Sequence, residues 1–273
     1  GVGIRGGTGT TIGGTTASQR NVVSGNSGPA SSGISFRSAG SGVIVQGNYI
    51  GTDASGAVGL GNGLHGVACE RAGMTVGGLA ASPGAPPGNV ISANGAAGVY
   101  AISGAPTIQG NLIGLNAAGS AALANALGIQ SAGGGAMIGG ATVTARNIIS
   151  GNGKGVQSSG GTTVEGNFIG TDISGSVAVP NGTGVHLSTG SGNTIGGTTG
   201  TLGSPPGNVI SGNMSFGVNL DNLTIANQIR GNIIGADKDG VEALPNRVAG
   251  VQLNTVNAVG SNLVGGSTAG DRN

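Results

Sequence analysis

A short phrase recurs along the whole chain and constrains what the chain can fold into. It consists of an Asn, an apolar residue, an Ile or Val, and then a Ser or Gly. Copies begin at Asn21, Asn48, Asn89, Asn111, Asn147, Asn167, Asn208 and Asn232. The last residue, Asn273, stands where a further copy would begin. Short and long spacings alternate, so the units pair into super-repeats of roughly 60 residues, and such self-similarity is typical of stacked structural units.

Two further apolar segments accompany each phrase. One is exemplified by Gly184-Val185-His186-Leu187 and the other by Thr107-Ile108-Gln109-Gly110. Alternation of apolar and polar residues over four positions, bounded by Gly, predicts short strands, and no helical period is visible. Three short strands in a unit of about 20 residues fit one coil of a solenoid. We therefore predict an all-β fold, a right-handed parallel β-helix of about eight coils, with residues 1–273 forming a single domain.

The alternation also predicts which side chains face inward. The third position of the recurring phrase is always Ile or Val, so we expect it in the core. The Asn two positions earlier must face the same way, which stacks all eight Asn side chains at one inner corner. Each carboxamide can donate to and accept from its neighbours and the turn backbone, so a buried polar ladder would be satisfied.

The second position of the phrase predicts an apolar row on the outer face of the coils. Its members are Val22, Tyr49, Val90, Leu112, Ile148, Phe168, Val209 and Ile233. Such a stripe is larger than a soluble monomer usually leaves bare. The long units carry extra loops, and we expect Leu60, Leu123, Val179 and Leu244 of these loops to pack onto the row. A bare row would instead indicate a partner.

Composition excludes several functional classes. The chain has 63 Gly but only 9 Pro and no Gly-X-Y period, so it is not collagen. Charged residues make up 7% with a net charge of +1, so the sequence offers no clustered basic patch for nucleic acid. No run of about 18 apolar residues is present, so we expect no membrane span. The Gly-, Asn-, Thr- and Ser-rich surface is similar to that of secreted or cell-surface repeat proteins.

Repeated acidic residues are the first candidate for chemistry. Asp53, Asp172 and Asp237 recur at one position, where the fourth copy has Asn116, and each is followed three residues later by Gly. Repeated carboxylates could bind calcium. The same pattern is also a turn in which the side chain caps backbone amides. We expect the turn, because the copies lie two coils apart, roughly 10 Å, too far to share an ion.

Other reactive residue types are few and scattered. His65 and His186 have no Cys or acidic cluster at metal spacing, so we expect two exposed surface histidines. Cys69 lies on a core-facing position and is expected to be an inert buried thiol. Three N-glycosylation acceptor patterns, at Asn181, Asn213 and Asn222, are expected by chance in a chain so rich in Asn and Thr. The residues therefore predict no catalytic group, cofactor site or metal site.

The repeats resemble those of a known family. Asn147-Ile148-Ile149-Ser150-Gly151-Asn152, Gly166 to Asp172 and Thr194 to Gly197 are similar to right-handed parallel β-helix repeats of large bacterial extracellular proteins. This resemblance covers essentially the whole chain and implies the pectate-lyase-like superfamily, which includes polysaccharide lyases, epimerases, hydrolases, phage tailspikes and adhesins. In the lyases it implies acidic calcium ligands beside a catalytic Arg or Lys. The sequence shows no such constellation.

The two ends of the sequence match each other in phase. The stretch from Gly1 to Asn21 is similar to that from Gly250 to Asn273, and neither carries a helix, a charged block or a Pro-rich cap. We therefore expect an uncapped, structural or adhesive extracellular solenoid that is not an enzyme. Its partners would be neighbouring repeats of a longer array, or further copies stacked end to end into a fibre. The alternative is a carbohydrate-active β-helix enzyme or a polysaccharide-binding module.

Overall fold

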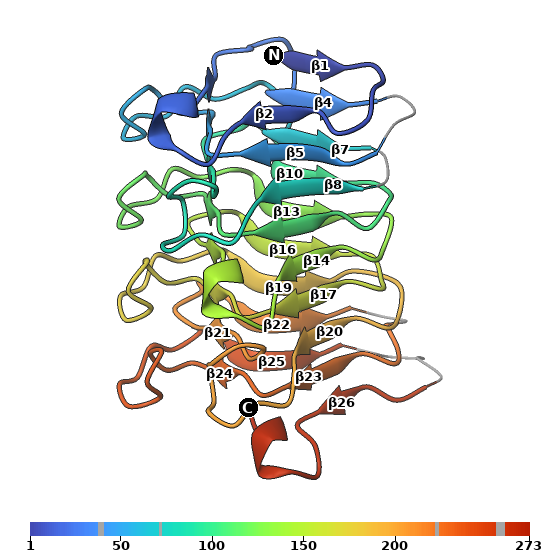
Figure 1. The fold of residues 1–273 in the computed structure, drawn as a ribbon. Helices are drawn as coiled ribbons and strands as arrows, with labels where there is room; N and C mark the ends of the chain where they lie inside the picture. Colours follow the sequence, from blue (N-terminus) through green and yellow to red (C-terminus); the bar gives the residue numbers. More distant parts are fainter. Residues whose placement is uncertain (38–40, 71–72, 222–223, 255–259) are drawn as a thin grey trace.

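A computed structural model describes residues 1–37, 41–70, 73–221, 224–254 and 260–273. The chain winds into a rod of stacked coils with the N-terminus at one end and the C-terminus at the other (Figure 1). Three sheets run along the rod, and all their strand pairings are parallel. The predicted parallel β-helix is confirmed. We name the sheets A, B and C in the order in which each coil visits them.

Each coil contributes one short strand to each sheet, except that the last described coil has strands only in sheets A and B. Sheet A contains β1 (Val2–Ile4), β4 (Ile34–Phe36), β7 (Val67–Cys69), β10 (Ala97–Ala101), β13 (Leu127–Ser131), β16 (Lys154–Ser158), β19 (Thr183–Leu187), β22 (Phe216–Leu220) and β25 (Ala249–Leu253). Sheet B contains β2 (Thr11–Gly13), β5 (Val43–Gln46), β8 (Met74–Gly77), β11 (Thr107–Gln109), β14 (Met137–Gly139), β17 (Thr163–Glu165), β20 (Thr194–Gly196), β23 (Gln228–Arg230) and β26 (Leu263–Val264). Sheet C is built from the recurring phrase and contains β3 (Val22–Val23), β6 (Tyr49–Ile50), β9 (Val90–Ile91), β12 (Leu112–Ile113), β15 (Ile148–Ile149), β18 (Phe168–Ile169), β21 (Val209–Ile210) and β24 (Ile233–Ile234).

The core lies inside the coils and is filled by the residues that the alternation predicted. Ile113, Ile129 and Ile138, one from each sheet, are fully buried in one continuous cluster. Equivalent residues pair in register from coil to coil, as Ile91, Ile113 and Ile149 do in sheet C. One coil alone could not bury this face, so the stacking of neighbours creates the core.

The predicted Asn ladder forms at the corner between sheets B and C. The backbone N–H and the Nδ2 of Asn89 both donate to Oδ1 of Asn111 in the next coil, at 3.0 and 2.9 Å. Nδ2 of Asn89 also donates to the carbonyl of Val45 in the preceding coil, at 2.8 Å. The pattern repeats from Asn21 through to Asn273. These buried carboxamides are therefore satisfied, and each joins three coils.

A second Asn ladder, which we did not predict, runs along the corner between sheets C and A. Its members repeat the geometry of the first and are Asn26, Asn62, Asn94, Asn125, Asn152, Asn181, Asn213 and Asn246. A short third ladder joins Asn193, Asn227 and Asn262 at the remaining corner. At all three corners of the solenoid, Asn carboxamides therefore hydrogen-bond neighbouring coils to one another, over part or all of its length.

Three short 3₁₀ turns occur at a regular interval along the chain, each shortly before one Asn of the first ladder. They are η1 (Ala17–Gln19), η2 (Val143–Ala145) and η3 (Ala269–Asp271), and each begins after a Thr: Thr16, Thr142 and Thr268. Successive copies are 126 residues apart, and an Arg and a ladder Asn follow each of them. The larger period of the chain is therefore four coils, twice the pair of coils that the spacing of the phrase indicated.

Candidate functional site

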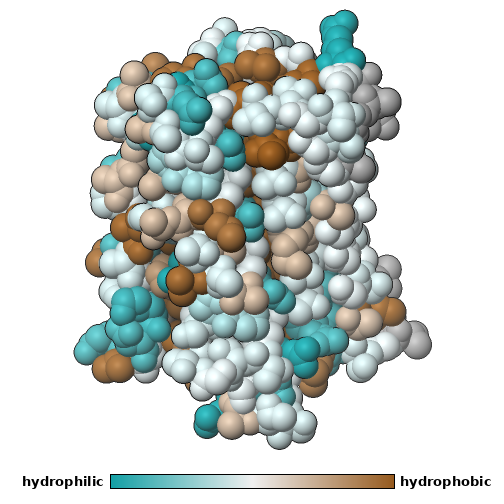
Figure 2. Space-filling model, viewed as in Figure 1, coloured by the Kyte–Doolittle hydropathy of each residue, from teal (hydrophilic) through white to brown (hydrophobic). Residues whose placement is uncertain are grey.

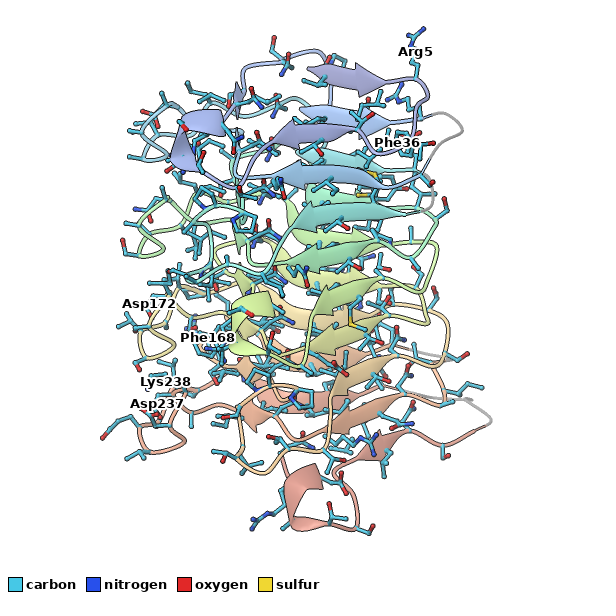
Figure 3. All side chains as sticks on the ribbon, in the orientation of Figure 1. Arg5, Phe36, Phe168, Asp172, Asp237 and Lys238 are labelled. Carbon is cyan, nitrogen blue, oxygen red and sulfur yellow. The ribbon has the colours of Figure 1, made fainter. Side chains whose placement is uncertain are left out.

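The outer apolar row is not a bare surface. Seven of its eight members are buried, and only Val22, in the first sheet C strand, is 45% exposed. They form a second hydrophobic cluster outside the coils, together with Leu115 and Val179. Figure 3 shows Phe168, one member of the row, lying behind the loops that project from the rod. The row is therefore a second core rather than a binding surface.

The expectation about which residues cover the row is only partly correct. Val179 belongs to the cluster, but Leu60 is 49% exposed, and Leu123 and Leu244 are half-buried and lie outside it. At Leu115 and Ala236, the residue that starts the hairpin loop packs against the row instead, because it directly follows the corner Gly that ends the recurring phrase. Thr52 and Thr171 occupy the same position and are fully buried.

Two arginines complete the cover of this second core. The Cζ atom of Arg20 lies 3.9 Å from the ring centroid of Tyr49, and that of Arg146 lies 3.9 Å from the ring of Phe168. In both pairs the Arg follows a 3₁₀ turn and the aromatic ring belongs to the next coil. Their Nε atoms donate to the carbonyls of Gly47 and Gly166. The guanidinium groups thus cover the faces of the aromatic rings, and the charged groups remain hydrogen-bonded to backbone carbonyls.

The repeated acidic residues form turns, as expected. Oδ1 of Asp53 accepts from the N–H groups of Ala57 and Val58, at 3.0 and 3.1 Å, and Asn116 caps its own turn in the same way. These bonds hold the pKa of the Asp53 carboxyl below its ordinary value, with the hydroxyl of Ser55 the largest cause. No group of three or more His, Cys, Asp or Glu that could hold a metal occurs in the described ranges.

The four turns also touch one another, which we did not expect. The N–H of Ala117 donates to the carbonyl of Gly56 at 2.8 Å, although these residues belong to alternate coils. The N–H groups of Ile173 and Lys238 repeat this bond to Gly119 and Gly175, at 2.9 Å in both cases. The hairpins therefore form a column beside the rod, visible as the stacked loops at the left of Figure 1. In Figure 2 the hydrophilic group at the lower left lies over the last hairpin, residues 236–246.

The two histidines do not lie free on the surface. His65 is half-buried and stacks on Tyr100 with the ring centroids 4.3 Å apart. Its Nδ1 accepts the N–H of Ala97, and burial lowers the pKa of its imidazole. His186 is buried, so the expectation of an exposed ring was wrong for it. Its neighbours along the outer face of sheet A shield its ring.

His186 is the centre of a chain of polar side chains from three coils. Its Nε2 lies 2.6 Å from Oδ2 of Asp221, and its Nδ1 lies 2.7 Å from Nζ of Lys154. Nζ also donates to Oε1 of Gln157 at 3.4 Å, and Nδ2 of Asn219 donates to the other oxygen of Asp221 at 3.0 Å. The register of β16, β19 and β22 aligns Gln157, His186 and Asn219. Sequence reasoning missed this group because its members are distant along the chain and meet only through that register.

The remaining candidates behave as inert structure. Cys69 is fully buried, and burial raises the pKa of its thiol to about 12. Asn181 and Asn213, in two of the glycosylation patterns, are buried members of the second ladder. The third, at Asn222, lies outside the described residues. Among the described residues, no helix is long and apolar enough to cross a membrane.

Comparison of the chain with protein-family models, with curated proteins and with solved structures gave no match.

Proposed function

We propose that this chain is a structural or adhesive β-solenoid of the cell surface or extracellular space, related to the pectate-lyase-like superfamily. The observation that carries the proposal is the constant direction of the Asn ladders. In every pair the N–H and Nδ2 donors belong to the earlier coil and the Oδ1 acceptor to the later one. Such a column can extend through any number of coils, which is a property of a scaffold.

The end faces of the described rod are complementary in this respect. A coil placed after Asn273 would need to supply only an Asn Oδ1 at each ladder corner, as the later coil of every pair does. Apolar residues are also exposed at both faces, Val2 and Val22 at one and Leu253, Leu263 and Val264 at the other. The following coil could belong to the same polypeptide, as in a longer array, or to a second copy, as in a fibre.

The longer array and the end-to-end fibre differ in the strands that are present at the junction between two rods. In the described part of the chain, sheets A and B have nine strands and sheet C has eight. Two copies stacked end to end would leave sheet C one strand short at each junction, and buried backbone groups would lose their partners there. In an array, a strand of the recurring phrase directly after Asn273 would fill this position. The array and the fibre therefore differ in whether the backbone groups of sheet C are paired at the junction.

A seamless tandem protein tests the array. Because Asn273 and Asn21 occupy equivalent positions, residues 1–273 can be followed directly by residues 22–273. The expected product is one rod of about twice the length, with a higher thermal midpoint than the single chain, because solenoids gain stability from each added interface. A tandem of two complete copies joined by a flexible Gly/Ser linker is the control. Two modules that melt at the midpoint of the single chain in both proteins would refute the array.

The fibre is tested by electron microscopy of the single chain at high concentration. Filaments would support it, and Val264→Asp at the end face should then dissolve them while Val177→Asp, on a hairpin, should not; both side chains are exposed. Dispersed short rods at every concentration would exclude the fibre.

A polysaccharide-binding module is the second candidate, and the outer face of sheet A favours it. Side chains with hydrogen-bonding groups follow one another there in register, one per coil, and are Tyr100, Gln130, Gln157, His186, Asn219 and Gln252. An extended sugar polymer lying along the rod would meet a polar side chain of this row about every 4.8 Å, except at His186, whose two ring nitrogens are already bound by Lys154 and Asp221. Affinity electrophoresis in gels containing neutral or acidic polysaccharides tests this. Retardation that Gln130→Ala weakens and Gln46→Ala, on sheet B, does not would support it, and unretarded migration in all gels would exclude it.

A further inference from the structure

We propose that Lys154 is a reactive amine, a site at which activated acyl donors such as esters, thioesters or acyl phosphates become covalently attached. The inference does not depend on the proposed function. It rests on the sequence of contacts from Lys154 through His186 to Asp221, which places a nucleophile, a base and a group that orients the base within hydrogen-bonding distance of one another.

The contacts define where the protons lie. A lysine ammonium has only donors, so Nδ1 of His186 must be the acceptor of the 2.7 Å bond to Nζ. The ring proton is then on Nε2 and donates to Oδ2 of Asp221 at 2.6 Å. The same tautomer is fixed by the carboxylate in hydrolytic triads.

This arrangement supplies what acylation of an amine requires. Nζ transfers a proton to Nδ1 of His186, and its freed lone pair attacks the acyl carbon. The C–N bond forms, the bond from the acyl carbon to the oxygen or sulfur of the leaving group breaks, and the leaving group takes the proton from His186. A second proton of the amine passes to water, which leaves a neutral amide. Asp221 stabilises the transient imidazolium, and Asn219 holds the carboxylate in place.

The chain contains its own control. Its only other lysine is Lys238, whose Nζ lies 2.6 Å from Oδ2 of Asp239 at the tip of a hairpin (Figure 3). A carboxylate is a weaker base than an imidazole, so Asp239 is a poorer acceptor for a proton of Lys238 than His186 is for a proton of Lys154. Lys154 is half-buried and Lys238 is exposed. A difference governed by access alone would therefore favour Lys238.

The test is acetylation by p-nitrophenyl acetate at limiting concentration and mildly alkaline pH, with both lysines quantified by mass spectrometry of proteolytic peptides. Lys154 should be acetylated at least about tenfold faster than Lys238, a threshold set below the ~10²- to 10⁴-fold contribution of a positioned general base because Lys154 is the less exposed of the two. His186→Gln should remove the advantage and leave the rate of Lys238 unchanged. Asp221→Asn should lower the rate of Lys154 to an intermediate value, and Gln157→Ala, which removes the other contact of Nζ, should preserve it.

Equal or slower acetylation of Lys154 in the unmodified sequence would overturn the proposal without any variant. So would an unchanged advantage in His186→Gln, once its far-ultraviolet circular dichroism and thermal midpoint match those of the parent. If that variant does not fold, the rate in Asp221→Asn decides the role of the imidazole, because a rate equal to that of the parent would contradict it.

Discussion

At the scale of single residues, the ladder Asn side chains do more than fill a corner. Oδ1 of Asn111 accepts two donors from Asn89, and its own Nδ2 donates to Asn147 and to the carbonyl of Val76. Removing the Asn111 carboxamide therefore leaves unsatisfied groups in the preceding coil, whereas Oδ1 of Asn147 in the next coil still accepts the backbone N–H of residue 111. A buried donor without a partner costs more than the bond itself contributes.

Asn111→Ala should lower the free energy of unfolding by about 3 kcal/mol, because at least two buried groups lose their partners. Asn116→Ala is the matched control five residues away, since Asn116 caps an exposed turn. Its loss should cost about 1 kcal/mol, as for other capping side chains. Denaturant unfolding of both variants checks the difference, and equal costs would contradict the role given to the ladder.

A glycine ends every second strand of sheet B up to β20, as Gly77 ends β8, and the same ladder requires it there. Gly77 has φ of +89°, and a Cβ there would lie 1.9 Å from the carbonyl oxygen of Gln109. Gly77→Ala should therefore cost about 3 kcal/mol or more, because the next coil must move. Gly25 has φ of +71° with nothing within 4 Å of an added Cβ, so Gly25→Ala should cost only about 1 kcal/mol from backbone strain. Thermal or denaturant midpoints of the two variants test this.

At the scale of elements, the loops and the outer face of sheet C stabilise each other. The loops cover the apolar row, and the hairpins among them form their own hydrogen-bonded column. Leu112→Ala should cost about 3 kcal/mol, as for other fully buried leucines. Val22→Ala should change stability by less than about 0.5 kcal/mol, because Val22 is exposed. Similar losses in both variants would mean that the row is not a second core.

At the scale of the whole molecule, the hairpin carboxylates make stability depend on acid. The pKa values of Asp53 and Asp237 are lowered in the fold, the first mainly by the Ser55 hydroxyl and the second mainly by the N–H of Val241. Their contribution is therefore fully present above the unfolded carboxyl pKa of 3.8 and is lost as pH falls below it.

The thermal midpoint should accordingly fall between neutral pH and pH values below about 4. In the double variant Asp53→Asn, Asp237→Asn the fall should be smaller, because an amide oxygen caps the turn without titrating, as Asn116 already does. Midpoints measured across this range for both proteins check the prediction. An identical acid dependence would show that other groups control it.

The sequence by itself determined the coil. A phrase of constant internal spacing fixes which residues alternate inward, so the three sheets, the core and the first ladder followed from periodicity. The second ladder was not predicted, because its Asn residues stand at variable distances before the Gly at the next sheet A strand. Asn152 lies three residues before Gly155, whereas Asn26 lies seven residues before Gly33. Such a ladder cannot be identified from the local spacing of its Asn residues. It is recognised only in the folded chain, where these residues lie at the same corner of successive coils.

Only the tertiary structure decided what happens outside the coil. Three features depend on how the loops fold back and on the register between coils. They are the cover of the apolar row, the contacts between hairpins of alternate coils, and the group of polar side chains around His186. These contacts join residues such as Lys154, His186 and Asp221, which no local period relates. The repeat determines the features that successive coils share, whereas the contacts around His186 come from residues that differ from one coil to the next.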